Sequence, residues 1–256
     1  MIIDTHAHLY YENLLTDIDG ILERAFKSGV ERIIVPAVDL KTSEIIMGLA
    51  DKFEMIYAAV GFHPCDIKEK NIGDIKFLED FIKHEKTVAI GEIGLDYFWD
   101  KTYNELQKDF FRAQVELAAN SGLPIIIHTR DSIKDAIEIL KLTNMANLSG
   151  QFHCFSGDEE DLEKVLAFKN FYISYCGNVT YKKFSAINVV EKTPAEKLLA
   201  ETDSPFLTPE PFRGKNNEPS RVIYSIRKIS EIKKMDFDIL KERLFENTKT
   251  LFKKIN

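Results

Sequence analysis

Residues 123–130 read LPIIIHTR and residues 87–96 read TVAIGEIGLD, two short apolar runs that each end in polar side chains. Runs of this length that are rich in β-branched residues are typical of strands buried on both faces. Six similar runs lie outward from them along the chain: MIIDTH (1–6), ERIIVPAVD (31–39), EMIYAAVGFH (54–63), SGQFHCFSG (149–157), FYISYCGN (171–178) and EKLLAETDS (196–204). We therefore expect eight strands.

Amphipathic segments fill the stretches between these runs, for example residues 17–29, 104–122 and 131–142. Gly29 and Gly122 close two of them, as glycine commonly does where a helix ends. Alternating strands and helices indicate right-handed βαβ units and a parallel sheet. A doubly wound open sheet is the competing fold, but it usually has a glycine-rich loop after the first strand, where this chain has THAHLY.

The predicted fold class is therefore α/β, with the architecture of a (β/α)8 TIM barrel. Eight strand–helix units in 256 residues match the usual size of that barrel. No linker or low-complexity tract divides the chain, so we expect a single domain over residues 1–256. An additional C-terminal helix is expected within residues 236–256, packing outside the barrel.

Composition narrows the class of protein. The net charge of −7 argues against a basic protein that binds nucleic acid passively, although metal ions could supply the charge that meets a phosphate. Three cysteines without a CxxC pair fit a reducing compartment rather than a disulfide framework. We find no signal peptide and no apolar run long enough to cross a bilayer, so we expect a cytoplasmic protein that does not associate with membranes.

Polar side chains follow the apolar runs where each predicted strand ends. In a TIM barrel the carboxyl ends of the strands converge on one face, which holds the active site. A lone histidine there is more often a hydrogen-bonded core residue, but five of the six histidines of this chain occupy such positions. Together they predict a metal site, built from the side chains of His6, His8, Glu92, His128, His153 and Asp203, with His63 beside it.

The motifs around these residues resemble those of the TatD-type metal-dependent deoxyribonucleases, which belong to the amidohydrolase-like barrels. The matching stretches occur in the order and spacing of that family and cover most of the chain. They are DTHAHL (4–9), VGFHP (60–64), AIGEIGLDYFWD (89–100), LPIIIHTRDS (123–132), FHCFSG (152–157) and ETDSPFLTPEPFRGKNNEPSRV (201–222).

This resemblance implies two divalent metal ions. The first is expected on His6, His8, Glu92 and Asp203, and the second on Glu92, His128 and His153, with Glu92 bridging the two. The family is usually described as Mg²⁺-dependent in assays, whereas imidazole-rich ligands favour Zn²⁺, Mn²⁺ or another transition metal. Related barrels often carry a carbamylated lysine at the strand-four position, where this chain has Glu92.

The expected chemistry is hydrolysis through a hydroxide that bridges the two ions, which also clamp the phosphodiester. Asp203 is expected to orient the attacking water and take its proton, and Glu92 to set the separation of the ions. His63 precedes a proline and is expected to hold a phosphate oxygen or protonate the departing alkoxide. A hydrogen-bonded loop histidine is the alternative interpretation of His63.

Four further residues are expected to bind substrate. Arg130 suits bidentate pairing with phosphate, the alternative being a salt bridge to Asp131. Arg213, Lys215 and Asn217 occupy the loop after Asp203 and are expected to contact substrate, whereas the basic residues from 227 to 234 fit a solvated helix face.

Two further predictions concern residues beside the expected ligands. The aromatic residues 97–99 follow Glu92 and either stack on unpaired bases or form a lid over the barrel mouth. Cys154 neighbours His153, so strand alternation predicts that it points into the packing behind the barrel wall.

The leading functional hypothesis is a metal-dependent nuclease that cleaves DNA, acting as a 3′–5′ exonuclease on single-stranded ends as the resemblance implies. The same metal site could instead hydrolyse another ester or amide, such as an acyl ester on tRNA or a small cyclic amide. A non-catalytic metal-binding scaffold is the third hypothesis. No obligate protein partner is evident.

Overall fold

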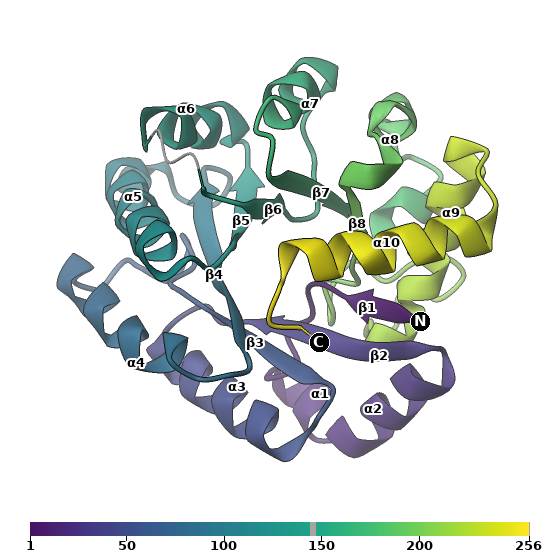
Figure 1. The fold of residues 1–256 in the computed structure, drawn as a ribbon, viewed down its shortest axis with the longest axis horizontal. Helices are drawn as coiled ribbons and strands as arrows, with labels where there is room; N and C mark the ends of the chain where they lie inside the picture. The colour runs from purple at the N-terminus through teal and green to yellow at the C-terminus, as the bar shows by residue number, and fades with distance from the viewer. Residues whose placement is uncertain (144–146, 256) are drawn as a thin grey trace.

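The computed structural model describes residues 1–143 and 147–255 and contains the predicted TIM barrel (Figure 1). Eight parallel strands pair in chain order, and the ring closes between its last and first members. Thr5 N donates to Ala200 O at 3.2 Å, and Ala7 forms a parallel bridge with Ser204. The strands are β1 (Ile2–Asp4), β2 (Val30–Pro36), β3 (Ile56–Val60), β4 (Thr87–Asp96), β5 (Ile125–Arg130), β6 (Gly150–Phe152), β7 (Phe171–Tyr175) and β8 (Leu198–Ala200).

Helices surround this ring and connect successive strands (Figure 1). Local sequence sets several of their ends: Asp39 and Asp158 cap α3 and α7 with their side chains, and Gly122, with φ +71°, ends α5. The helices are α1 (Glu12–Leu15), α2 (Ile18–Lys27), α3 (Leu40–Lys52), α4 (Leu78–Ile82), α5 (Asn104–Ser121), α6 (Ile133–Thr143), α7 (Glu159–Leu166), α8 (Ile187–Lys192), α9 (Val222–Lys233) and α10 (Phe237–Leu251). Within the described residues, no helix has the length and apolar character needed to span a bilayer.

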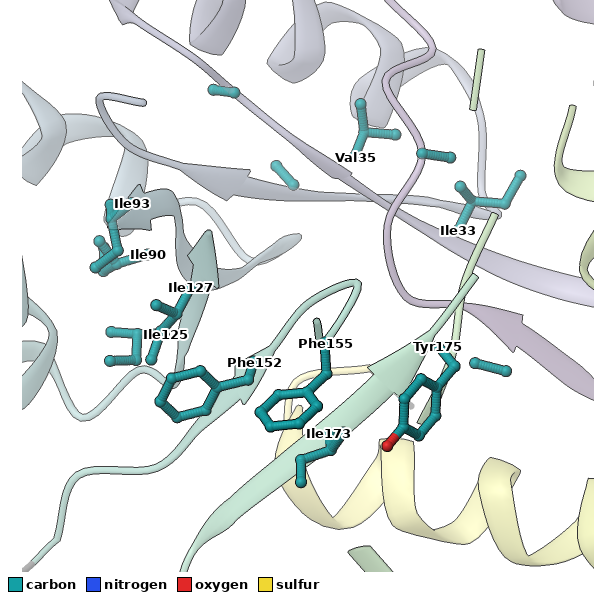
Figure 2. Packing of buried hydrophobic residues seen from close by; sticks show 14 of the residues in the cluster. Ile33, Val35, Ile90, Ile93, Ile125, Ile127, Phe152, Phe155, Ile173 and Tyr175 are labelled. Atoms are coloured by element: carbon teal, nitrogen blue, oxygen red, sulfur yellow. The ribbon is translucent and has the colours of Figure 1, made fainter. Parts of the chain in front are cut away.

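The main apolar core lies between the strands and the helices. Alternate strand residues face outward, among them Ile33 on β2 and Ile125 and Ile127 on β5, and the last two lie beside the aromatic ring of Phe152 (Figure 2). These side chains are almost fully buried. Their burial explains why the strands read as continuous apolar runs.

A second apolar cluster fills the barrel at the end where the strands begin. Strand residues such as Ile3 and Leu199 pack there against Phe245 of α10 and against Phe252 and Ile255 beyond it. The terminal residues reach the start of β4, because Lys254 Nζ donates to the backbone oxygens of His84 and Thr87. The predicted additional helix is therefore present, and with the residues after it closes one end of the barrel.

Inside the barrel, the next layer of side chains toward the carboxyl ends of the strands is polar. Gln151 Nε2 lies 2.9 Å from Thr5 Oγ1, 2.8 Å from Ser174 Oγ and 2.8 Å from Glu201 Oε2, and all four residues are fully buried. This network links β6 and β7 to the segments after β1 and β8. It forms the floor on which the side chains of the carboxyl-terminal face stand.

Candidate metal centre and catalytic pocket

The six predicted metal ligands come together at the carboxyl-terminal face of the barrel, although they are spread over some two hundred residues. Most of them are buried, and Glu92 is only 2% exposed. His84, the one histidine that does not follow a predicted strand, lies in the turn before β4 and contacts Asp51 instead. The cluster draws its side chains from the segment after β1 (His6, His8), β4 (Glu92), β5 (His128) and the segments after β6 (His153) and β8 (Asp203).

One half of the cluster consists of four mutually close donor atoms. His6 Nε2 and His8 Nε2 lie 3.1 Å apart. Glu92 Oε2 is 3.3 Å from the first nitrogen and 3.6 Å from the second, and Asp203 Oδ1 is 3.7 Å and 3.4 Å from them. Two imidazole nitrogens and two carboxylate oxygens therefore face a common centre.

The other half is built on the second oxygen of the same glutamate. Glu92 Oε1 lies 2.9 Å from His128 Nδ1 and 2.9 Å from His153 Nε2, and these two nitrogens are 3.2 Å apart. Glu92 thus presents one oxygen to each half of the cluster.

These distances suit divalent metal ions. Ligand atoms bound at about 2.0–2.2 Å to one tetrahedral or octahedral ion lie about 3–3.5 Å from one another. Two imidazole nitrogens only 3.1 Å apart face each other unfavourably unless a hydrogen or a cation lies between them, and a cation there could accept a lone pair from each. The mixture of imidazole and carboxylate donors fits Zn²⁺, Mn²⁺ or another transition metal.

The electrostatics of the cluster keep both carboxylates ionised. Burial acts to raise the pKa of Glu92, but the neighbouring His153 and His6 hold it well below its usual value. Burial likewise opposes ionisation of Asp203, yet a hydrogen bond from His8 and the charge of His6 leave its pKa lowered. Two anionic side chains therefore stand at the centre of the pocket.

Asp203 adopts an uncommon backbone conformation. Its φ is +57°, in the left-handed region that a non-glycine residue rarely occupies. The backbone nitrogen of Asp203 donates to His6 O at 2.8 Å, which ties the segment after β8 to the segment after β1. Such conformations gather at functional sites because the surrounding fold holds them in place.

Three residues that the sequence did not single out face the outer ring nitrogens of the ligand histidines. Asp96 Oδ2 lies 2.9 Å from His128 Nε2, and Glu201 Oε1 lies 3.4 Å from His153 Nδ1. The hydroxyl of Tyr10 is 3.0 Å from Nδ1 of His8. A partner on the far ring nitrogen fixes both the tautomer and the orientation of a ligand histidine. Asp96 ends the stretch GLD (94–96), and Glu201 begins the stretch ETD (201–203). An acidic residue this close in sequence to a predicted ligand was the signal that could have identified both.

His63 lies at the edge of the same cluster. Its Nε2 is 3.6 Å from Glu92 Oε1, and its Nδ1 is 3.5 Å from Asp66 Oδ2. Burial opposes the charged imidazolium, but the charge of Glu92 and the contact with Asp66 raise the pKa of His63 well above its usual value. His63 thus lies in reach of both the ligands and the open pocket.

A pocket of about 620 Å³ opens over the cluster. Arg130 and Trp99 belong to its wall, and the Arg130 guanidinium carbon lies 3.7 Å from the ring centre of Phe98 and 5.2 Å from that of Trp99. In the described part of the chain Arg130 has no ion pair. The salt bridge to Asp131, which was the alternative interpretation of Arg130, is therefore absent there. Tyr97 turns away, because its hydroxyl donates to Asp135.

The three residues predicted from the loop after Asp203 have different surroundings. Arg213 stacks on the ring of Tyr181 at 4.1 Å and lines a neighbouring groove of about 580 Å³. Lys215 is exposed and lies outside the residues that line either cavity. The prediction for Asn217 was wrong: this side chain is fully buried, and its amide donates to the backbone oxygens of Thr202 and Phe206. Asn217 holds the loop in shape and has no surface for substrate.

The prediction for Cys154 also fails. Strand β6 ends at Phe152, and Cys154 has a φ of +42°, so strand alternation no longer sets its direction. Its side chain lines the catalytic pocket instead of the packing behind the barrel wall.

Comparison with known proteins gives one consistent result. The family model described as TatD related DNase matches residues 3–253. An uncharacterized metal-dependent hydrolase from Bacillus subtilis, YabD, is 44% identical, with 99% of each chain covered. The crystal structure of YjjV, a TatD homolog from Escherichia coli, superimposes with a TM-score of 0.93 at 31% identity and 98% coverage of both chains. A TatD family hydrolase from Entamoeba histolytica gives 0.85 at 26% identity, covering 98% of this chain and 97% of that one.

Proposed function

Because the chain belongs to the TatD family of metal-dependent hydrolases, we propose that it hydrolyses phosphodiester bonds of DNA, removing nucleotides from single-stranded ends in the 3′ to 5′ direction. The observation that carries this proposal is the position of Arg130. It is a cation without an ion pair in the described structure, supported on two aromatic rings, and it lines the same pocket as five of the six clustered ligands, His6 being fully buried.

Two divalent ions are part of the proposal. His6, His8, Glu92 and Asp203 would hold one, and Glu92, His128 and His153 would hold the other. When bound, such ions polarise a phosphoryl oxygen and lower the pKa of water, so that a nucleophile exists near neutral pH. Mg²⁺ follows from the family resemblance, and Zn²⁺ or Mn²⁺ from the ligand types.

Asp203 is the proposed proton acceptor. Its lowered pKa keeps the carboxylate ionised at neutral pH, and its side chain also lines the open pocket. The Oδ1 atom of Asp203 faces the histidine pair. We assign to its other oxygen the role of orienting a water molecule and receiving its proton.

His63 is the proposed partner of the leaving group. The ring borders the same pocket, and Asp66 Oδ2 lies 3.5 Å from its Nδ1, so an acid on the far side of the ring supports a proton-donating imidazole. A protonated imidazole in this place can donate to a phosphate oxygen or to the departing alkoxide. Neutralising that oxygen lowers the cost of breaking the ester bond.

Recognition of a strand is assigned to one arginine at the catalytic pocket and to a neighbouring basic groove. At the catalytic pocket, Arg130 can pair with phosphate while Phe98 and Trp99 beside it offer faces for base stacking. The neighbouring groove adds Lys182, Lys183 and Arg213, for which the described structure contains no ion pair. Asn178 borders both cavities, so they adjoin. An arginine beside a basic groove suits successive phosphates of one chain better than a small cyclic amide.

The test is hydrolysis of single-stranded DNA labelled at its 5′ end, with the metal-reconstituted protein and Asp203→Asn compared. We expect the wild-type protein to produce a ladder of shortening labelled products and the variant to lose most of this activity. Immediate release of a labelled mononucleotide would reverse the proposed polarity. Intact DNA under Mg²⁺, Mn²⁺ and Zn²⁺ would refute the nuclease, and acyl esters of tRNA would then be the substrates to assay.

A further inference from the structure

Two cysteines face each other at the floor of the catalytic pocket, and the proposed hydrolysis uses neither of them. Cys154 follows β6 and Cys176 follows β7, and their sulfur atoms lie 2.8 Å apart. Both are free thiols. This separation is shorter than ordinary contact between sulfur atoms and about 0.8 Å longer than the S–S bond of a disulfide, so a sub-ångström approach of the two sulfurs would allow the bond to form.

The surroundings leave one sulfur accessible and the other enclosed. Cys154 lines the pocket and is partly exposed, whereas Cys176 is fully buried. Asn178 contacts both, with Oδ1 3.4 Å from Cys176 Sγ and Nδ2 3.9 Å from Cys154 Sγ. An oxidant entering the pocket therefore meets Cys154 first, with Cys176 already in place behind it.

We propose that Cys154 and Cys176 are a site of reversible oxidation that forms an internal disulfide with a hydroperoxide. The sulfur of Cys154 attacks the peroxide, its O–O bond breaks, and Cys154 becomes a sulfenic acid while water (or an alcohol) leaves. The sulfur of Cys176 then attacks the sulfur of Cys154, and the sulfenic oxygen leaves as water. The two thiols lose two protons and two electrons, which the peroxide accepts. This site does not depend on the identity of the hydrolysed substrate.

The disulfide would act on the metal centre through Glu201. The backbone nitrogen of Cys154 donates to Glu201 Oε1 at 2.6 Å, and the same oxygen faces Nδ1 of His153. His153 is also the residue directly before Cys154 in the chain. Drawing the sulfurs together shifts the backbone that carries both contacts, so oxidation is expected to weaken metal binding at Glu92, His128 and His153.

The experiment uses the full-length Cys65→Ser variant, since Cys65 also lines the pocket and would otherwise react. We expect hydrogen peroxide to remove both remaining thiols and to lower the intact mass by two hydrogens. Trypsin should then release a linked pair of peptides, residues 142–164 joined to residues 170–182, which dithiothreitol separates. The oxidised protein should bind zinc in a competition titration more weakly than the reduced protein.

The double variant Cys65→Ser/Cys176→Ser is the matched control and should give no linked peptide. If it fails to fold, the linked peptide from Cys65→Ser alone decides the question. Retention of both thiols, or sulfinic acid at Cys154 without the linked peptide, would overturn the proposal. Equal zinc affinity before and after oxidation would overturn the coupling to the metal centre.

Discussion

Asp96 Oδ2 lies 2.9 Å from His128 Nε2, and this contact decides which ring nitrogen His128 presents to Glu92. With Nε2 occupied by Asp96, the Nδ1 atom faces the Glu92 carboxylate at 2.9 Å. The carboxylate of Asp96 also makes the imidazole of His128 a stronger donor to a metal ion. The second half of the metal centre therefore depends on a residue that is not itself a ligand.

We expect Asp96→Asn to weaken metal binding at this half by roughly 10- to 100-fold, the range typical of such supporting contacts. The asparagine keeps the shape of the side chain but removes its charge. Competition with a chromophoric chelator gives the affinity, and Asp135→Asn, at an acid paired with Lys108 outside the cluster, serves as the control. Unchanged affinity in Asp96→Asn would show that His128 needs no such support.

Removing metal is expected to lower the stability of the fold. Four histidines and two carboxylates converge in a largely buried cluster that exists only in the folded chain, so a cation held there favours the folded state. A ligand present at about 100 times its Kd stabilises the native state by about 2.7 kcal/mol. Thermal unfolding with Zn²⁺ and with excess chelator should differ by several degrees. Identical midpoints would argue against metal binding to the folded protein.

Asp4 is expected to make the stability of the metal-free protein depend on pH. Burial, aided by the charge of Glu201, raises the pKa of Asp4 to about 8, although Thr202 donates to it from both backbone and side chain. The folded state then binds a proton that the unfolded state has lost. Its stabilisation is complete below the ordinary carboxyl pKa of 3.8 and falls as the pH rises through about 8.

Asp4→Asn should flatten this part of the pH profile, because the amide does not titrate. The difference in slope is expected to approach about 1.4 kcal/mol per pH unit between about pH 5 and pH 8. Urea unfolding of both proteins at several pH values, in the presence of chelator, measures it. Parallel profiles for the two proteins would mean that Asp4 keeps an ordinary pKa.

Arg130→Ala is expected to raise the KM for single-stranded DNA by about tenfold or more, the loss that follows from removing a charge-assisted phosphate contact. Arg130→Lys should recover little, since an ammonium cannot reproduce the planar stack on Phe98. Arg227→Ala is the matched control. Arg227 belongs to α9, and it also stacks on an aromatic ring, that of Phe237. Equal effects of Arg130→Ala and Arg227→Ala would remove the case for a phosphate site at Arg130.

The barrel and the clustering of its ligands could be predicted because both follow from simple periodicities. Strand β4 occupies the whole of TVAIGEIGLD (87–96), and His128 lies inside the run LPIIIHTR. Buried parallel strands read as apolar runs, and a TIM barrel places its active site at their carboxyl ends. Polar residues at those ends therefore pointed to one shared site before any distance was known.

Other features depend on contacts that no local pattern encodes. Gln151 looks like an ordinary polar strand residue, yet it contacts three segments of the chain inside the barrel. Asn217 looked like an exposed loop residue, but the loop folds back and buries it. The direction of Cys154 could not be inferred because a positive φ interrupts the alternation at that residue.

Native mass spectrometry of the zinc-reconstituted protein is the most direct test of the central claim, that Glu92 joins two metal positions in one cluster. We predict two ions per chain in the wild-type protein and one in His153→Ala, because the positions on His6, His8 and Asp203 remain intact. A single ion in the wild-type protein, retained unchanged in His153→Ala, would contradict the account.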